Sequence, residues 1–441
     1  MKNIIENVEK HRQLILDAER YIWEHPETGY KEFETSKYMA EQFEKLGYNL
    51  IYAEGITGFY TDIDTGRKGP KVLILAELDS VICPEHKDSN PVTGAVHACG
   101  HNAQCAAMLG VAGALKEPNA LNDLCGSIRL CVVPAEELLE IEFRRGLKDK
   151  GVIKYFGGKS EFLYRGYFDD VDIAFMVHTA SSYCAVSGAV GCVAKNITYK
   201  GLAAHAGGSP NRGINALYAA TNGLNAVNAL RETFKESDCI RFHPIITKGG
   251  EMVNAIPETV NIESYVRGAS YDAIIRENKK VNRALIGGAL SIGANIEIVD
   301  IPGYAPLTND TNMTDIAKEA YETLFGEPFR VYSSLETGST DMGDLSSIMP
   351  VVHPYCGGAR GKGHGNDYEI YDPEQACVKC ASWQVGMLYT LLSKNAERGY
   401  KVINEFKPTF ASKEEFLKFQ DSLNDCGDRI TYTDDSAQIR L

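Results

Sequence analysis

The chain has 441 residues, of which 45 are Lys or Arg and 59 are Asp or Glu, so its formal net charge is −14. A chain of this length is expected to form about two or three hydrophobic cores. Because the charge balance is acidic and no basic stripe interrupts it, nucleic acid and anionic membranes are excluded as partners.

The first sixty residues have helical periodicity followed by a hairpin pattern. Residues 1–13, MKNIIENVEKHRQ, form an amphipathic pattern without the apolar core of a signal peptide. The segment TSKYMAEQFEKLG predicts a second helix with Thr35 as its N-cap. No apolar run in the sequence reaches the roughly 18 residues of a membrane span. We therefore expect a cytoplasmic protein that does not bind membranes.

Three apolar runs of strand length follow: KVLILAELD (71–79), IRLCVVPAEE (128–137) and VDIAFMVH (171–178). They are nearly continuous in Val, Ile, Leu and Ala, as strands buried on both faces are. Helical segments separate them, so the sequence predicts an α/β fold with a mainly parallel sheet covered by helices. Because the carboxyl ends of parallel strands form the ligand crevice, the ionisable residues at these ends should converge. These residues are Glu77, Asp79, Glu136, Glu137 and His178.

From about residue 193 the pattern changes to strand, helix, strand, strand, helix, strand, which is the order of a ferredoxin-like unit. Alternating helix and strand patterns resume after about residue 306. The second unit is therefore an insertion. We predict a catalytic domain of residues 1–186 and 306–441, interrupted by an inserted α+β domain of residues 187–305.

Twelve cysteines are scattered along the chain. They do not form a disulfide framework in a chain of this size, and in a reducing compartment most are small core residues or ligands. Cys377 and Cys380 form a C-x-x-C within a helical run that has no second pair. Packing is favoured for this pair over a redox or zinc role.

The loop GAVHACGHNAQ (94–104) places His97, Cys99 and His101 on alternate positions directly before an apolar helical run. Zinc and related divalent ions prefer thiolate, imidazole and carboxylate ligands. A single His or Glu at a strand end is more often structural than a ligand, but three strand ends and a C-x-H loop in one sheet favour a metal site. The candidate ligands are Cys99, His101, Glu137, His178 and His364, the last from the glycine-rich GARGKGHGND.

The adjacent carboxylates Glu136 and Glu137 need separate roles. Neighbouring residues at a strand end point in opposite directions, so one can bind metal while the other faces a metal-bound water. A glutamate beside such a water is a suitable general base, because the metal lowers the pKa of the water toward about 7. The alternative for an acidic pair at a strand end is a solvated loop.

Eight motifs in order carry a resemblance to a known family: LILAELD, HACGHN, PAEE, MVH, GLAAHAGGSPNRGINAL, GGEMVNAIPETVNIESYVRG, STDMGDLSSIMP and GHGND. They resemble the aminoacylase and glutamate carboxypeptidase family of dinuclear metallohydrolases. Within it they are most similar to the amidohydrolase branch, which includes hippurate, auxin-conjugate, aminobenzoyl-glutamate and β-alanyl-dipeptide hydrolases. The resemblance runs from about residue 10 to 410.

The resemblance implies two divalent ions, zinc first with manganese or cobalt as alternatives, and a role for each matching residue. Cys99 would be a thiolate ligand able to bridge the two ions, and His97 a local support. Glu136 would be the catalytic base and Asp79 the residue that orients the ligands. The remaining implied ligands are His101, Glu137, His178 and His364. Glu77 stands where other branches carry a metal-binding His, and its role stays open.

The resemblance also assigns a second group of residues to the inserted domain. His205 would polarise the scissile carbonyl, while Asn254 and Arg267 would bind the carboxylate of the substrate. The planar guanidinium of arginine suits that task because it pairs with a carboxylate through two hydrogen bonds. In related enzymes this domain acts as a lid and forms a dimer, so we expect a homodimer in which His205 completes the site of the partner.

These patterns together predict a metal-dependent amidohydrolase that cleaves N-acyl amino acids or small dipeptide-like substrates through a metal-bound hydroxide. A dipeptidase of the β-alanyl-dipeptide or aminobenzoyl-glutamate type is the alternative, since Asn102 and Gln104 follow that type. The LLEIEF segment after PAEE departs from it. Two alternatives of other classes are a non-catalytic metal-dependent binding protein and a thiol enzyme with Cys99 as nucleophile and His97 or His101 as base.

Overall fold

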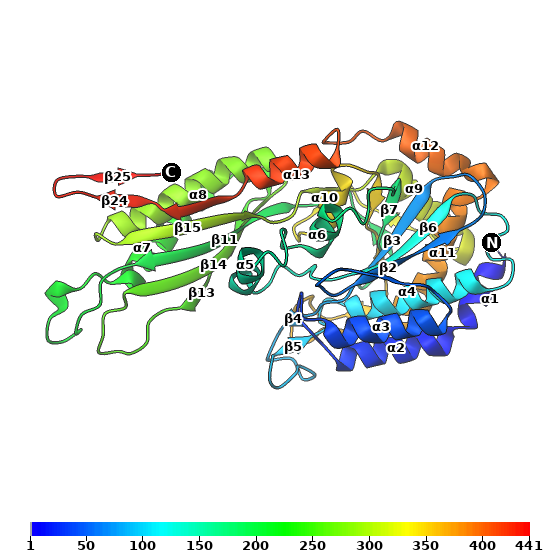
Figure 1. The fold of residues 1–441 in the computed structure, drawn as a ribbon, viewed down its shortest axis with the longest axis horizontal. Helices are drawn as coiled ribbons and strands as arrows, with labels where there is room; N and C mark the ends of the chain where they lie inside the picture. The colour runs from blue at the N-terminus through cyan, green and yellow to red at the C-terminus, as the bar shows by residue number, and fades with distance from the viewer. Residues whose placement is uncertain (1) are drawn as a thin grey trace.

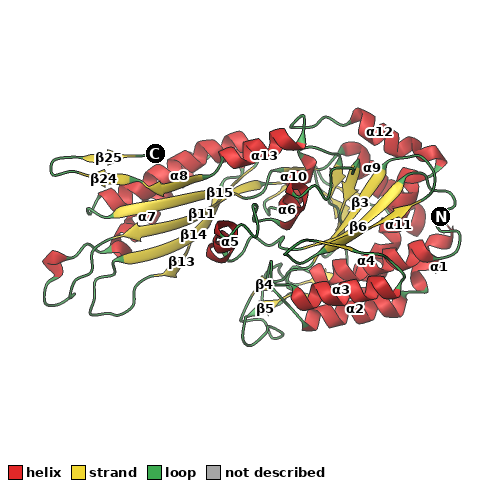
Figure 2. Cartoon of the chain, viewed as in Figure 1, coloured by secondary structure: helices red, strands yellow, loops and turns green. Residues whose placement is uncertain are grey.

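The computed structural model describes residues 2–441 and shows a mixed α/β fold. Two parts, each built on its own sheet, lie end to end along the long axis of the molecule (Figure 1). Helices cover the sheet of the first part, and two long helices cover one face of the second sheet (Figure 2). Over residues 2–441, no helix combines the length and the hydropathy that a membrane span requires.

The first part contains a six-stranded sheet in the order β1-β2-β6-β3-β7-β19. Its strands are β1 (Ile51–Tyr52), β2 (Phe59–Asp64), β3 (Lys71–Glu77), β6 (Ser127–Val133), β7 (Ile173–Phe175) and β19 (Val351–Val352). The β6, β3, β7 and β19 strands are parallel neighbours, whereas β1 and β2 join by antiparallel pairing. Side chains of β3 alternate between two cores, with Ile74 in one and Leu75 in the other.

The first of these cores contains α4 (His101–Lys116), a helix that is buried on every side. All of its residues from His101 to Leu115 are buried. Helices around it are α1 (Lys2–Glu9), α2 (Arg12–Glu24), α3 (Phe33–Lys45), α9 (Thr311–Phe325), α11 (Cys380–Leu392) and α12 (Glu397–Glu405). Cys377 and Cys380 are buried in the same core, as the packing interpretation predicted.

The opposite face of the sheet is covered by α6 (Gly158–Tyr164), α10 (Met342–Ser346) and α13 (Lys413–Ser422). A short helix, α5 (Ile141–Asp149), lies near the second sheet (Figure 1). Smaller strands complete this part: β4 (Val81–Ile82), β5 (Ala95–Val96), β8 (His178–Thr179), β9 (Cys184–Ala185), β10 (Gly188–Ala189), β16 (Leu307–Thr308), β17 (Arg330–Val331), β18 (Leu335–Glu336), β20 (Tyr355–Cys356), β21 (Ala359–Arg360) and β22 (Glu369–Ile370).

Three local predictions differ from the structure. Thr35 is not an N-cap, because α3 begins at Phe33 and the Thr35 hydroxyl donates instead to the carboxylate of Glu27 at 3.0 Å. The run 128–137 ends as a strand at Val133, so Glu136 and Glu137 lie in the following loop. The run 171–178 is divided, since β7 ends at Phe175 and His178 begins β8 in another sheet.

The second sheet is antiparallel, in the order β12-β14-β11-β15-β23, with β13 also paired to β14. Its elements are β11 (Gly191–Lys200), α7 (Ala216–Asn228), β12 (Arg241–Phe242), β13 (Ile245–Lys248), β14 (Thr259–Gly268), α8 (Tyr271–Leu290) and β15 (Asn295–Pro302). Alternate residues of β14 are buried against α7 and α8. Tyr265 and Arg267 therefore point to the face that α7 and α8 leave open.

The C-terminal segment departs from the predicted domain limits. We predicted residues 306–441 in the catalytic domain, but β23 (Asp425–Asp428) pairs with β15 of the second sheet, and β24 (Ile430–Tyr432) forms a hairpin with β25 (Ala437–Ile439) beside it. Helix α13 connects the two parts along one side of the molecule (Figure 1). The pairing has a physical basis in sheet edges, because β23 satisfies backbone groups of β15 that would otherwise be unpaired.

Candidate metal centre

The loop before α4 holds Cys99 and His101 in a fixed conformation. Gly100 has φ +89°, and a Cβ atom there would lie 2.4 Å from the Tyr368 hydroxyl and 2.8 Å from Thr179 Oγ1. Only glycine fits this position without a shift of its neighbours. The turn that follows places the His101 ring at the first residue of a fully buried helix.

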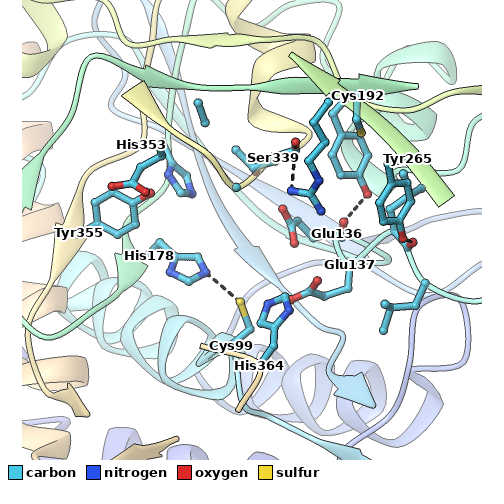
Figure 3. A pocket seen from close by; sticks show the side chains of 18 residues that line it. Cys99, Glu136, Glu137, His178, Cys192, Tyr265, Ser339, His353, Tyr355 and His364 are labelled. Carbon is cyan, nitrogen blue, oxygen red and sulfur yellow. Dashed lines mark hydrogen bonds and ion pairs between the residues drawn. The ribbon is translucent and has the colours of Figure 1, made fainter. Parts of the chain in front are cut away.

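Cys99 is shared by two groups of potential ligands. One group is Cys99, His101 and His178, and the other is Cys99, Glu137 and His364, with all ligand atoms in each group within 4.8 Å of one another. Cys99 Sγ lies 3.3 Å from His178 Nε2, and Glu137 Oε1 lies 3.0 Å from His364 Nε2. Figure 3 shows these four side chains converging. The structure thus brings together all five residues that the sequence predicted as ligands.

Asp79 fixes the orientation of two of these ligands. His101 Nδ1 lies 2.9 Å from the Asp79 carbonyl oxygen and 3.2 Å from Asp79 Oδ1, while the backbone N–H of Glu137 donates to Asp79 Oδ2 at 2.8 Å. Because Nδ1 is engaged, Nε2 is the nitrogen of His101 that remains for a metal. Contacts of this kind are expected of a residue that orients metal ligands without binding the ion itself.

The donor atoms fit a pair of divalent ions. His101 Nε2 and Glu137 Oε1 are buried and form no hydrogen bond with any of residues 2–441, although His364 Nε2 lies 3.0 Å from Glu137 Oε1. Unpaired buried polar atoms are rare in folded proteins. Close approach without a hydrogen bond is what ligand atoms of one ion show, and thiolate, imidazole and carboxylate suit zinc and its relatives.

The charges around Cys99 favour its thiolate. Burial and the charge of Glu137 oppose ionisation of the thiol, but His178 and His101 outweigh them and lower the pKa of Cys99 to about 6. A thiol with a pKa below neutrality is available as a metal ligand at physiological pH. His364 in turn lowers the pKa of Glu137 below its usual range, against the effect of burial.

Glu136 is placed beside the ligands without being held by any of them. Its Oε2 atom lies 3.9 Å from His101 Nε2, and the Tyr304 hydroxyl donates to its backbone oxygen. Burial, together with the charges of Glu77 and Glu137, raises the pKa of Glu136 well above its ordinary value. A carboxyl group in this setting binds a proton readily, as an acid–base residue must.

A pocket of about 320 Å³ opens onto this centre. Arg267 lines it and directs Nη1 to Ser339 Oγ at 3.4 Å. His353 and Tyr355 form one side of the pocket, with Tyr265 and Cys192 on the opposite side (Figure 3). The pocket therefore offers one guanidinium and several aromatic surfaces to a small ligand.

Two predicted site residues lie elsewhere. His205 and Asn254 are exposed on the second part of the molecule and do not line the pocket. His205 Nδ1 accepts hydrogen bonds from the backbone N–H groups of Gly207 and Gly208 at 3.1 and 2.8 Å. Nε2 therefore carries the ring proton in the neutral ring, and it has no hydrogen-bond partner among residues 2–441.

His97 lies near the candidate metal centre but belongs to neither ligand group. Its ring is fully buried, and neither ring nitrogen has a hydrogen-bond partner among residues 2–441. Burial lowers the pKa of His97 to about 3, with a further contribution from His101. It packs in the loop as a neutral ring, so any support it gives to the site comes from packing.

Sequence reasoning missed three buried residues of the site: Lys159, Asp341 and His353. Lys159 and Asp341 form a buried ion pair next to Glu77, and His353 is only 4% exposed in the pocket wall with Nε2 unpaired within residues 2–441. The motif STDMGDL contains Asp341, but nothing in its spacing indicates a lysine partner. For Lys159 the one available signal is a charged residue directly after Gly157 and Gly158, at the start of a helix.

Comparison with known proteins identifies relatives over most of the chain. Residues 73–390, which include all five candidate ligands, match Peptidase family M20/M25/M40. The Xaa-Arg dipeptidase of Mus musculus is 26% identical over 409 residues, which cover 89% of this chain and 85% of that protein. The IAA-amino acid hydrolase ILR1-like 4 of Arabidopsis thaliana is 26% identical over 356 residues, which cover 77% and 76%. A dinuclear metal binding peptidase of the M20 family from Bacillus subtilis has a TM-score of 0.63 at 20% identity, with 87% of this chain and 99% of that chain covered.

Proposed function

Because this chain belongs to Peptidase family M20/M25/M40, we propose that it cleaves the amide bond of N-acyl amino acids or small dipeptide-like substrates. Metal-dependent hydrolysis is the activity of the family to which it belongs. The names of its relatives include a dipeptidase and a hydrolase of indole-3-acetyl amino acids, which are substrates of that size and kind. The dipeptide-like substrates are the alternative that Asn102 and Gln104 favour.

The observation that carries the proposal is the sharing of Cys99 between two ligand groups that open into one pocket. A nucleophilic thiol would need a free sulfur and an adjacent base, whereas Cys99 lies among four other donor residues. A binding protein would have no use for the buried acid Glu136 beside these ligands. Both alternatives of other classes are therefore less well supported than hydrolysis.

We assign the two ions to the two groups. Cys99, His101 and His178 would hold one ion, and Cys99, Glu137 and His364 the other, with zinc as first choice and manganese or cobalt as alternatives. When bound, the ions would supply a Lewis acid that lowers the pKa of a nearby water and polarises the substrate carbonyl. Asp79 keeps His101 and Glu137 in place for this task.

Glu136 is the proton carrier in this proposal. Its carboxylate takes the proton of the attacking water and returns it to the nitrogen of the leaving amine. Tyr304 holds the backbone of Glu136, so that the side chain remains directed to the centre.

Substrate binding is assigned to residues of the second sheet. Arg267 in the pocket wall would pair with the substrate carboxylate, with Asn254 as a second contact. The free Nε2–H of His205 suits a donor to the scissile carbonyl oxygen, where charge develops during attack. Neither His205 nor Asn254 reaches the pocket of its own chain, so the site needs a second chain or a closed domain arrangement to be complete.

We propose a homodimer that forms through the inserted lid domain. This domain consists of residues 187–305 together with the segment from residue 425, and residues 1–186 and 306–424 form the catalytic domain. The segments near His205 and Asn254 expose large apolar side chains, and one edge of β13 is unpaired within residues 2–441. The exposed side chains are Leu202, Ile245, Ile246, Met252 and Val253, the last fully accessible. Apolar surface beside an open strand edge is typical of a protein interface. Cytoplasmic location stays a prediction.

A screen of N-acyl amino acids and dipeptides, with detection of the released amine, tests the proposed reaction. We expect turnover of at least one class by the metal-loaded protein and none after chelation. Comparison of Arg267→Ala with wild type on the best substrate then tests the carboxylate contact. We expect KM to rise for the acid and to change little for its amide. Absence of amine release across the panel with two ions bound would contradict the proposal.

A further inference from the structure

A buried ion cluster lies directly behind the metal centre. Lys159 Nζ is 2.5 Å from Glu77 Oε1 and 2.5 Å from Asp341 Oδ1, and all three side chains are fully buried. The backbone N–H of Lys159 also donates to Asp341 Oδ2 at 2.8 Å. Buried ion pairs contribute little net stability, because desolvation of the charges offsets their attraction. The cluster therefore calls for a reason other than stability.

The packing of α6 shows how closely this lysine is held to the site. The helix begins at Gly158, where a Cβ atom would lie 1.7 Å from the carbonyl oxygen of Pro134. Glycine thus lets the first turn of α6 contact the segment that leads to Glu136. The next residue is Lys159, so its ammonium group enters the space between β3 and the turn before α10.

The other oxygen of Glu77 faces the ligands. Glu77 Oε2 accepts a hydrogen bond from Gln104 Nε2 at 2.9 Å and lies 3.1 Å from His101 Nε2. His101 Nε2 is the atom that would bind the ion. The donor atoms of Glu77, His101 and Glu136 also lie within 4.8 Å of one another. Glu77 is therefore within reach of the ion that His101 would hold.

We propose that Lys159 is a positioning residue that holds Glu77 beside this ion instead of on it. Catalytic zinc sites combine three protein ligands with one position left for water or substrate. Cys99, His101 and His178 already supply three ligands, and a carboxylate from Glu77 would fill the fourth position. Lys159 binds one oxygen of Glu77 and Gln104 binds the other, which keeps that position open. This inference rests on the proposed hydrolysis, because only catalysis requires an open position.

The test uses full-length protein loaded with cobalt, whose visible absorption weakens as its coordination number rises. In Lys159→Met, the released Glu77 carboxylate should coordinate the ion. We expect two bound cobalt ions, a weaker visible band, and a fall in kcat of about 10 to 100-fold with KM little changed, which is the range for residues that support a metal site. In Glu77→Gln/Lys159→Met the competing ligand is absent, so the wild-type band should return and kcat should recover over Lys159→Met.

Glu77→Gln alone is the matched control, because it needs no change at Lys159. We expect its cobalt spectrum to equal that of wild type, since Glu77 is not a ligand when Lys159 holds it. A ligand-loss spectrum in Glu77→Gln, or an unchanged band in folded Lys159→Met, overturns the proposal. If Lys159→Met does not fold, the spectrum of Glu77→Gln still decides. These spectra need no substrate, so they stand even if no amide is cleaved.

Discussion

At the scale of single residues, the role of Glu136 in proton transfer gives the most specific prediction. It lies in the pocket wall, beside the two ligand groups that share Cys99 and in neither of them. Glu136→Gln should therefore retain both ions but lose turnover by about 100 to 10,000-fold, which is the usual contribution of general acid–base catalysis. Elemental analysis and kcat measured on the same preparation give the two quantities.

Two results would contradict this role. If Glu136→Gln has a kcat near that of wild type, another group moves the proton. If the variant loses an ion as well as activity, Glu136 is a ligand, and the division of tasks between Glu136 and Glu137 is wrong. His353→Ala, another change in the pocket wall outside the ligand groups, serves as a control, because it should leave the ion content unchanged.

The convergence of the five candidate ligands could be predicted from the sequence, because each lies in a short motif whose residue types suit a metal. The reason given for Glu136 and Glu137 was wrong, however. They do not alternate along a strand; they follow Ala135, whose φ of +55° turns the chain after β6 has ended. Lys159 could not be predicted, because its partners Glu77 and Asp341 are 82 and 182 residues away in the sequence.

At the scale of elements, α13 is anchored to the catalytic part by a buried carboxyl group. Asp344 on α10 accepts hydrogen bonds from the backbone N–H of Ala305 at 2.8 Å and from Gln420 on α13 at 3.2 Å. The Ser160 hydroxyl donates to its other oxygen. Three elements thus meet at a single side chain.

This carboxyl group predicts a pH dependence of stability. Burial raises the pKa of Asp344 to about 7, against the effect of its hydrogen bonds, whereas an Asp in an unfolded chain ionises near ~3.9. The native state binds the proton more tightly, so the contribution to stability is complete below about pH 4 and is lost as the pH rises through about 7. Asp344→Asn should lack this part of the pH dependence.

Denaturant unfolding at pH 5 and pH 8 measures the effect. We expect the free energy of unfolding of wild type to fall more between these values than that of Asp344→Asn. An equal fall in both proteins would show that Asp344 is ionised throughout. Asp64→Asn is the control, since Asp64 is an exposed acid at the end of β2, away from Asp344.

The order of the helices and strands was more predictable than the residues at which they begin and end. The order of β11, α7, β13, β14, α8 and β15 follows from hydrophobic periods of 2 and 3.6, which each segment shows by itself. The division of 171–178 into β7 and β8 could not be predicted, because Ala174 and His178 pair with different strands of the distant segment 351–356. The same limit applies to β23, because its four residues, Asp-Cys-Gly-Asp, show no clear hydrophobic alternation in the sequence.

At the scale of the whole molecule, the position of His205 predicts that two chains share each site. His205→Ala and Glu136→Gln homodimers should each be nearly inactive. Mixed dimers should regain one working site, because one pairing of chains combines an intact His205 with an intact Glu136. Activity after unfolding, mixing and refolding, with differently tagged chains to count mixed dimers, measures this.

The activity that mixed dimers can recover has a calculable upper limit. At equal mixing about half of the dimers are mixed, and each has one intact site of two, so about a quarter of wild-type activity is expected if both sites work independently. If mixed dimers form and no activity returns, His205 acts within its own chain or has no part in the reaction. Val253→Asp, on the exposed apolar surface near Asn254, should weaken the dimer without a change at the metal centre.

The dinuclear centre with a shared Cys99 is the claim on which the rest depends, and metal titration of the stripped protein tests it most directly. We expect chelation to abolish amide hydrolysis and two equivalents of zinc, manganese or cobalt per chain to restore it. Cys99→Ser should weaken binding of both ions, because a hydroxyl does not ionise near neutral pH as a thiol does. Activity that survives chelation and is lost on alkylation of Cys99, or restoration by a single equivalent, would contradict the account.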